Sequence, residues 1–128
     1  MRGRACLIVG GTGGIGRAVA SLFLHEAARV AVTGHAPDDL RLAEQELLPR
    51  ARSLDQFTAR LLDVTNPTAV DRVFGEAVDW SGGRLDVVVH VAGISGRRSG
   101  DGPLDSCTVE GWDETMKVNA RGVFLTNR

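Results

Sequence analysis

A glycine-rich segment, GGTGGIG at residues 10–16, most constrains the fold that this chain can adopt. It follows a short apolar run at residues 5–9, ACLIV, which is typical of a buried strand. From the end of the glycine-rich segment onward, apolar residues recur at the spacing of one face of a helix that runs to about Ala28: Ile15, Ala18, Val19, Leu22 and Phe23. Glycines between a strand and a helix let the backbone approach a phosphate, which the free N–H groups of the helix then bind. The segment therefore predicts a dinucleotide-type turn.

The glycine spacing fits several related dinucleotide fingerprints, because the glycines can be grouped in overlapping sets. A P-loop is excluded, since no Gly-Lys-Ser/Thr follows the glycines. The end of the second predicted strand then selects the cofactor, because an acidic residue there would bond the adenosine ribose and favour NAD. This chain has Gly34 followed by His35, and no carboxylate that would repel a 2′-phosphate. We therefore favour NADP over NAD, with His35 as a donor to the phosphate and Arg17 near it, although His35 also fits an ordinary exposed loop residue.

Strand and helix patterns alternate along the whole chain. Further strands are predicted at residues 29–33, 57–64 and 85–91, and further helices begin at Pro37, at the Asn66-Pro67 cap and at Thr108. The run Val87-Val88-Val89 is apolar on both faces, as in a parallel sheet that helices cover on both sides. The order predicts an α/β fold, a Rossmann-type doubly wound parallel sheet with right-handed crossovers.

Composition excludes several classes of protein. The 128 residues suit a single domain, and 43% hydrophobic with 24% charged residues indicates a globular chain. A net charge of −1 argues against a basic nucleic-acid binder. No apolar run approaches the ~20 residues that cross a bilayer, and the N-terminus lacks a signal-peptide pattern, so we expect a cytoplasmic protein. Cys6 and Cys107 have no metal-binding spacing, and we expect two reduced thiols and no metal site.

Four segments, in order, resemble the short-chain dehydrogenase/reductase family in its shorter, non-extended branch: VGGTGGIG at 9–16, DVT at 63–65, HVAG at 90–93 and VNARGVF at 118–124. The resemblance covers the family's N-terminal half and implies a sheet of order 3-2-1-4. It implies cofactor contacts from these motifs, with His35 added from the strand end: Gly10, Thr12, Gly13, Gly14, Ile15, Gly16, His35, Asp63, Val64, Ala92 and Gly93. It also implies a catalytic role for Asn119. Val9, His90 and Val91 depart from the family pattern, and the loss of two asparagines at 90 and 91 removes amide bonds that brace the central strands.

The resemblance implies hydride transfer between a nicotinamide and a small carbonyl or alcohol substrate. The family's acid–base pair is Tyr-x-x-x-Lys, yet this chain contains no Tyr, and its single Lys is Lys117. We therefore expect one NAD(P)-binding domain over residues 1–128, incomplete at its C-terminus and inactive alone, from a longer protein that forms a homo-oligomer. Its last helix would leave an apolar face partly uncovered. Two alternatives stay open: a non-catalytic nucleotide-binding module, and part of an extended-branch sugar-nucleotide epimerase or dehydratase, which His90 suggests. Arg97, Arg98 and Asp101 are expected in a solvated loop or at a polar substrate.

Overall fold

The computed structural model describes residues 1–96 and 103–128, and its strands and helices alternate. In chain order they are β1 (Ala5–Val9), α1 (Gly14–His25), β2 (Arg29–Gly34), α2 (Pro37–Leu47), β3 (Phe57–Leu61), α3 (Pro67–Trp80), β4 (Val87–His90), α4 (Val109–Met116), η4 (Lys117–Arg121, a π-helical turn) and α5 (Gly122–Asn127). Short 3₁₀ turns occupy Leu48–Arg50, Leu54–Gln56 and Leu104–Ser106. The four strands are parallel in the order β3-β2-β1-β4, which confirms the predicted Rossmann-type sheet.

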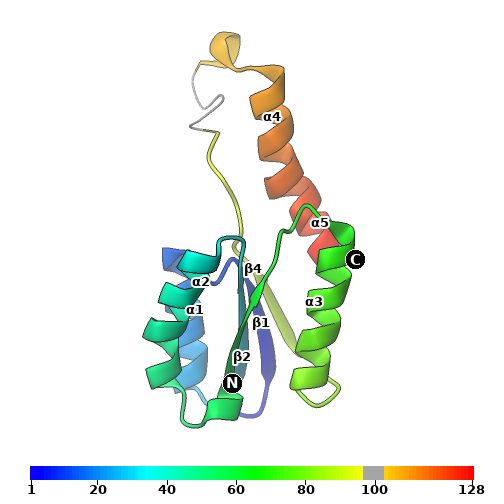
Figure 1. The fold of residues 1–128 in the computed structure, drawn as a ribbon. Helices are drawn as coiled ribbons and strands as arrows, with labels where there is room; N and C mark the ends of the chain where they lie inside the picture. The colour runs from blue at the N-terminus through cyan, green and yellow to red at the C-terminus, as the bar shows by residue number, and fades with distance from the viewer. Residues whose placement is uncertain (97–102) are drawn as a thin grey trace.

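Helices cover both faces of this sheet, α1 and α2 on one side and α3 with α5 on the other (Figure 1). Successive residues of β1 point to opposite faces, so Ile8 joins the core under α1 and α2 while Leu7 joins the core under α3 and α5. Both are fully buried. A central strand buried on both faces cannot alternate apolar with polar residues, which explains the uninterrupted run ACLIV.

Two predicted strands are longer than the observed ones. The strand expected at 57–64 ends at Leu61, because Asp63 accepts hydrogen bonds from the backbone N–H and the hydroxyl of Thr65, both at 2.8 Å, and so forms a turn. The strand expected at 85–91 is confined to Val87–His90. The shortening of β3 leaves residues 62–64 outside the sheet, at its carboxyl edge.

The expected face of α1 is right only in part, because Val19 and Phe23 pack against the core whereas other members of that face do not. Ile15 and Leu22 are 72% and 58% exposed, whereas Gly16, Ala20 and Leu24 are buried. The helix lies so close to the loop before it that a Cβ on Gly16 would stand 2.3 Å from the carbonyl oxygen of Gly10. Small residues therefore face the sheet at the start of α1, and Ile15 and Leu22 turn outward.

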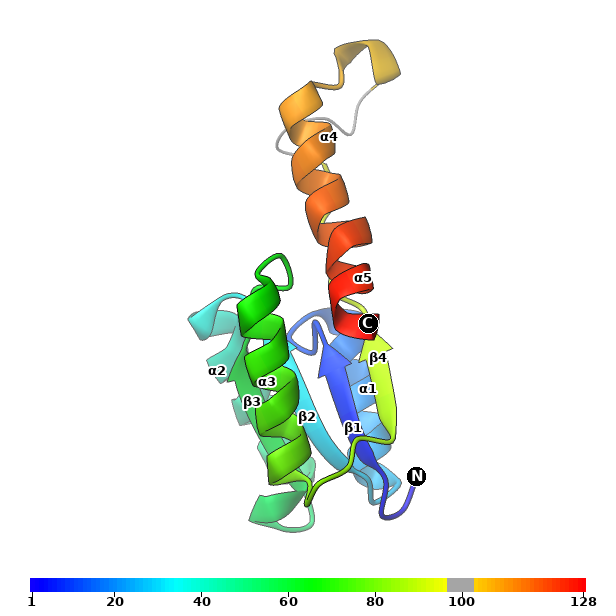
Figure 2. The same ribbon diagram turned by 90° about the vertical axis from the view of Figure 1, so that its right-hand side faces the viewer.

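The helix starts are as expected. Asn66 Oδ1 accepts from the N–H of Ala69 at 3.2 Å, and Thr108 Oγ1 accepts from the N–H of Gly111 at 3.1 Å. From Thr108 the chain forms one continuous column, α4–η4–α5, which rises beyond the carboxyl edge of the sheet (Figures 1 and 2). Its lower end, α5, packs beside α3, where Arg128 forms a two-pronged ion pair with Asp71.

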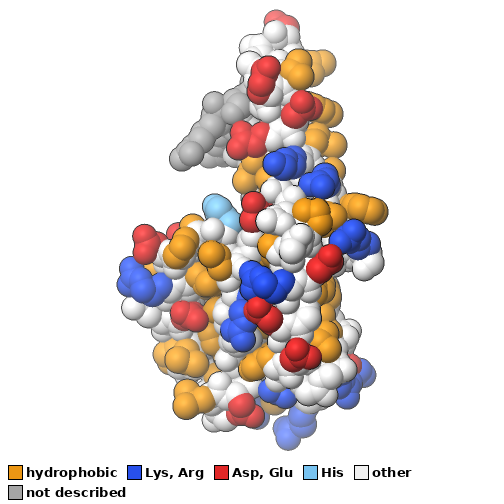
Figure 3. Space-filling view, turned by 45° about the vertical axis from the view of Figure 1, so that its right-hand side comes forward, with side chains coloured by type: hydrophobic (Ala, Val, Ile, Leu, Met, Phe, Trp, Pro, Cys, Tyr) orange, Lys and Arg blue, Asp and Glu red, His pale blue; other side chains and the backbone are white. Residues whose placement is uncertain are grey.

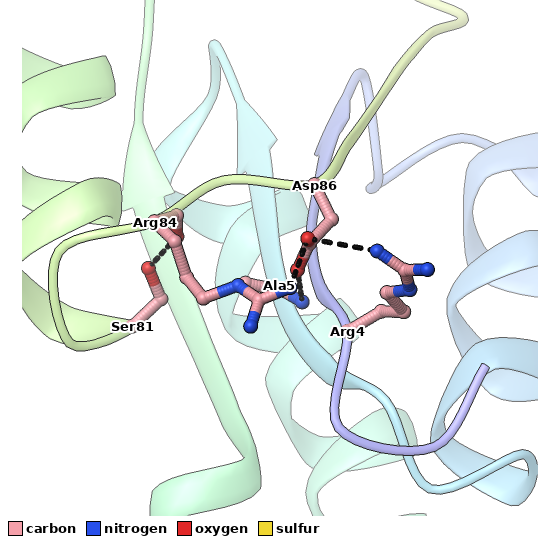
Figure 4. A network of polar contacts seen from close by, with 5 residues as sticks. All are labelled: Arg4, Ala5, Ser81, Arg84 and Asp86. Atoms are coloured by element: carbon pink, nitrogen blue, oxygen red, sulfur yellow. Dashed lines mark hydrogen bonds and ion pairs between the residues drawn. The ribbon is translucent and has the colours of Figure 1, made fainter.

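At the opposite, amino edge of the sheet, Asp86 links the segment before β4 to the start of β1 (Figure 4). Its carboxylate accepts from the N–H of Ala5 at 2.8 Å and from the guanidinium groups of Arg4 and Arg84. Ser81 holds the same connection by donating to the carbonyl oxygen of Arg84. In the described part of the chain, no helix has the length and apolar character needed to span a membrane, and Cys6 and Cys107 are free thiols.

Candidate functional site

A cavity of about 520 Å³ opens at the carboxyl edge of the sheet, where β1, β2 and β4 end. Many of the residues predicted to bind a cofactor line it: Gly10, Thr12, Gly13, His35, Asp63, Val64, Ala92 and Gly93. These residues come from four separate segments of the sequence. The edge of a parallel sheet where the strand order reverses is the usual ligand site of such folds, and here β1 lies between β2 and β4.

Other lining residues lie outside the predicted cofactor contacts: Thr33, Gly34, Asp39, Leu62, Val91, Ile94 and Val118. Val91 and Val118 are motif residues themselves, and Ile94 directly follows the motif HVAG, so counting every motif residue and the next position would identify all three. Three predicted residues lie outside this lining. Gly14 lines an outer groove between α1 and α2, Ile15 is exposed, and Gly16 lies behind the glycine loop.

The glycine loop is held between neighbouring backbone segments. Gly10 has φ +88°, a conformation that favours glycine, and a Cβ there would stand 2.5 Å from the backbone nitrogen of Ala92. Gly11 donates its N–H to the carbonyl oxygen of Thr33 at 2.8 Å. Helix α1 then begins after Gly13, whose lack of a side chain leaves the first turn without a side-chain cap. Uncapped N–H groups at a helix start, beside a cavity, suit an anionic group such as a phosphate.

Asp63 stands at the exposed mouth of the cavity. Partial burial raises the pKa of its carboxyl, but the N–H and hydroxyl of Thr65, and the positive charges of Lys117 and His35, hold that pKa below its ordinary value. The carboxylate is therefore ionised at neutral pH. Both bonds from Thr65 use Oδ1, so Oδ2 can accept from a ligand amino or hydroxyl group.

His35 is exposed on the lining, with Asp39 from the first turn of α2 also present there. Arg17 points elsewhere: its guanidinium pairs with Glu46 at 3.1 Å, in the outer groove between α1 and α2. The structure therefore keeps His35 as a candidate donor in the cavity and does not place Arg17 there. The predicted loop residues Arg97, Arg98 and Asp101 lie outside the described residues.

Asn119 lies in the π-helical turn η4 and binds the segment that follows β4. Its Oδ1 accepts from the N–H of Ile94, and its Nδ2 donates to the carbonyl oxygen of Ile94, both at 2.8 Å. The amide thus substitutes for a strand partner and fixes the lining residue Ile94. Short π-helical turns often occur at functional sites.

His90 restores a brace that the sequence suggested was lost. Because a carbonyl oxygen only accepts, Nε2 donates to the carbonyl oxygen of Ala92 at 3.1 Å, and in the neutral ring Nδ1 accepts from the Thr126 hydroxyl at 2.7 Å. Partial burial lowers the pKa of His90, and the hydrogen bond to the Ala92 carbonyl opposes this effect only in part. The lowered pKa favours the neutral imidazole. The imidazole therefore ties the end of β4 to α5, in the manner of a structural residue.

The comparisons with known proteins agree with this architecture. The model of the short chain dehydrogenase family matches residues 4–128. A short chain dehydrogenase/reductase of Macrophomina phaseolina is 33% identical over 128 residues, covering all of this chain and 70% of that protein. A short-chain type dehydrogenase/reductase from Mycobacterium ulcerans superposes with a TM-score of 0.89 at 32% identity, over 98% of this chain and 44% of that one.

The structure of an actinorhodin polyketide ketoreductase with NADPH superposes with a TM-score of 0.85 at 27% identity, over 96% of this chain and 44% of that one. The chain thus spans less than half the length of both of these solved structures. A family match over nearly the whole chain, joined to the parallel sheet and the glycine loop at its carboxyl edge, shows that this chain belongs to the short chain dehydrogenase family.

Proposed function

We propose that this chain is the cofactor-binding part of an NAD(P)-dependent oxidoreductase that acts on a small carbonyl or alcohol substrate. The observation that carries the proposal is the uncapped start of α1 at Gly13, which opens beside the cavity at the carboxyl edge of the sheet. The pyrophosphate would bind the N–H groups of the α1 first turn, including those of Gly14, Ile15 and Gly16, because a phosphate matches their partial positive charge.

The adenosine half would lie between the loop at Asp63 and the end of β2. Asp63 Oδ2 would accept from the adenine amino group, with Val64 and Val118 forming apolar walls. His35 would donate to a 2′-phosphate, and the missing carboxylate at Gly34 supports NADP rather than NAD. Ala92 and Gly93 would line the path toward the nicotinamide, which supplies or accepts a hydride when bound.

Asn119 is the residue that we assign to the catalytic apparatus, by its match to the family's VNxxG helix and its hold on Ile94. The sequence contains no Tyr, so these residues cannot supply the Tyr-x-x-x-Lys pair that serves the family as acid and base. We therefore propose that these residues bind the dinucleotide without catalysing hydride transfer. The exposed apolar side chains of α4 further suggest a homo-oligomer for the full-length protein. The cytoplasmic location stays a prediction from the sequence.

The test is a titration of the chain with NADPH and NADH, followed by fluorescence or calorimetry. We expect NADPH to bind more tightly. His35→Ala should weaken NADPH about tenfold and leave NADH unchanged, because one charge-assisted hydrogen bond to the phosphate is lost. His25→Ala, an exposed histidine on α1, is the matched control. Failure of both cofactors to bind the folded chain would overturn the proposal, and tighter NADH binding would overturn the assignment to NADP.

A further inference from the structure

Gly34 ends β2 at the cavity, at the position where a dinucleotide-binding chain specific for NAD would carry its acidic residue. The space for a side chain there is already filled. A Cβ built on Gly34 would stand 2.3 Å from Cγ2 of Thr12, 3.0 Å from its Oγ1 and 3.2 Å from its Cβ. Thr12 belongs to the glycine loop, so two segments distant in sequence compete for one volume.

Rotation of the Thr12 side chain relieves this overlap only in part. Threonine is branched at Cβ, so one rotamer turns the Cβ hydrogen toward Gly34, but Cγ2 then takes the place of Oγ1, which stands 3.0 Å from the added carbon. Its Cβ keeps the 3.2 Å separation in every rotamer. A carboxylate at position 34 therefore needs either a smaller residue at position 12 or a displaced loop.

The loop has little freedom to move. Gly11 and Gly10 donate their N–H groups to the carbonyl oxygen of Thr33 at 2.8 Å and to its Oγ1 at 3.3 Å. Gly11 also lies against Val32, since a Cβ on it would stand 2.5 Å from the Val32 Cβ. On its other side, Gly10 touches the backbone of Ala92. Thr12 is thus held in place by the two residues before it.

We infer that Thr12 is a specificity-determining residue, which keeps position 34 free of a carboxylate and so maintains the preference for a 2′-phosphorylated dinucleotide. The inference rests on the proposed function for its cofactor, but its steric part is independent of any ligand. It has a direct consequence: introducing an acidic residue at Gly34 alone does not convert the chain to NADH, whereas the same change with Thr12 shortened does.

The steric part is tested by thermal unfolding without ligand. Gly34→Ala, which adds a single carbon, should lower Tm by about 5 °C or more, as overpacking does. In the Thr12→Gly background the same change should cost little. Gly75→Ala is the matched control, because a Cβ on Gly75 in α3 meets nothing within 4 Å, and it should shift Tm equally in both backgrounds. An equal loss for Gly34→Ala in both backgrounds would overturn the coupling of the two positions.

The cofactor part is tested by the ratio of the NADH and NADPH dissociation constants. Gly34→Asp alone should weaken both cofactors about tenfold or more, because the loop is displaced. Because Thr12 lines the cofactor cavity, Thr12→Gly alone is the reference background, and the double variant should bind NADH more tightly than either single variant does and reverse the ratio relative to that background. Tight NADH binding by Gly34→Asp alone, with an unchanged Tm, would refute the role of Thr12. Failure of both NADPH and NADH to bind the folded wild type would refute the proposed function, and the melting temperatures would still show whether positions 12 and 34 are coupled.

Discussion

At the scale of the residue, Asn119 uses both ends of one side-chain amide on a single partner, Ile94. The bonded groups are backbone N–H and C=O, which need partners once β4 has ended. Ile94 lies on the cavity wall, so the amide sets the position of that wall. His90 acts comparably on the other side of the same segment, through Thr126.

Asn119→Ala should therefore loosen the segment after β4. We expect the amide hydrogen of Ile94 to exchange about tenfold faster and the chain to lose about 1 kcal/mol of stability, since these bonds are solvent-accessible. Hydrogen exchange followed by NMR or mass spectrometry measures both. Asn127→Ala is the control, because the amide of Asn127 donates to Val123 within its own helix. Unchanged exchange at Ile94 would mean that the amide pair does not hold the segment.

Asp86 predicts an acid sensitivity. The guanidinium of Arg84, the N–H of Ala5 and the guanidinium of Arg4 lower the pKa of its carboxyl to about 2. Because this pKa lies below the unfolded value of about 3.9, the stabilisation is complete above about pH 5 and is lost progressively as the pH falls through the folded pKa of about 2. Between pH 5 and pH 2, the melting temperature should fall less steeply with pH for Asp86→Asn than for the wild type. Parallel slopes would contradict this role.

At the scale of the element, α1 is positioned by the smallest residues in it. Gly16 faces backbone atoms, with a Cβ there 2.3 Å from the Gly10 oxygen and 2.7 Å from the Gly11 Cα. Backbone cannot rotate away as a side chain can, so the helix start and the glycine loop form one rigid unit. This close contact fixes the start of α1 relative to the glycine loop.

Gly16→Ala should destabilise the chain by at least about 2 kcal/mol and weaken binding of both dinucleotides, because the helix must move from the loop. Gly14→Ala should change stability by less than about 0.5 kcal/mol, since a Cβ there meets nothing within 4 Å. Chemical denaturation of the two variants in parallel provides the comparison. Equal stability of both would show that the close contact at Gly16 is relieved without cost.

At the scale of the whole molecule, the column α4–η4–α5 carries several of its large apolar side chains on the outside. Val109, Trp112 and Phe124 are 71%, 56% and 65% exposed, and Figure 3 shows hydrophobic side chains along the projecting column. The face that packs on the body presents Gly122, Leu125 and Thr126. The lack of a side chain at Gly122 helps to explain why this face packs on the body, because a Cβ there would stand 2.8 Å from Val64 Cγ2.

An exposed apolar helix face of this kind predicts self-association, as expected for the proposed homo-oligomer. Sedimentation velocity should show a mass that rises with concentration, and Trp112→Glu should weaken the association at least about tenfold. Leu54→Glu is the control, because Leu54 is 84% exposed and lies far along the chain from this column. A monomer at every concentration would refute a role for this face in the chain alone.

Much of the fold followed from local patterns. The run of β1, the caps at Asn66 and Thr108 and the glycine loop each depend on residues within a few positions of one another, and each was predicted correctly. The end of β3 was not, because the Asp63–Thr65 turn interrupts the strand predicted over residues 57–64. The outward turn of Ile15 and Leu22 was missed because helical spacing marks an apolar face without saying how near the sheet lies.

The sequence by itself determined the alternation of strands and helices, the glycine-rich turn between β1 and α1 and the family, since these depend on the identity and spacing of neighbouring residues. Only the tertiary structure decided which distant residues meet: Asn119 with Ile94, His90 with Thr126, and Thr12 with Gly34. The physical reason is that such contacts depend on the separation of packed backbones to a fraction of an ångström. Residue spacing carries no measure of that separation, whereas close packing of the finished fold imposes it.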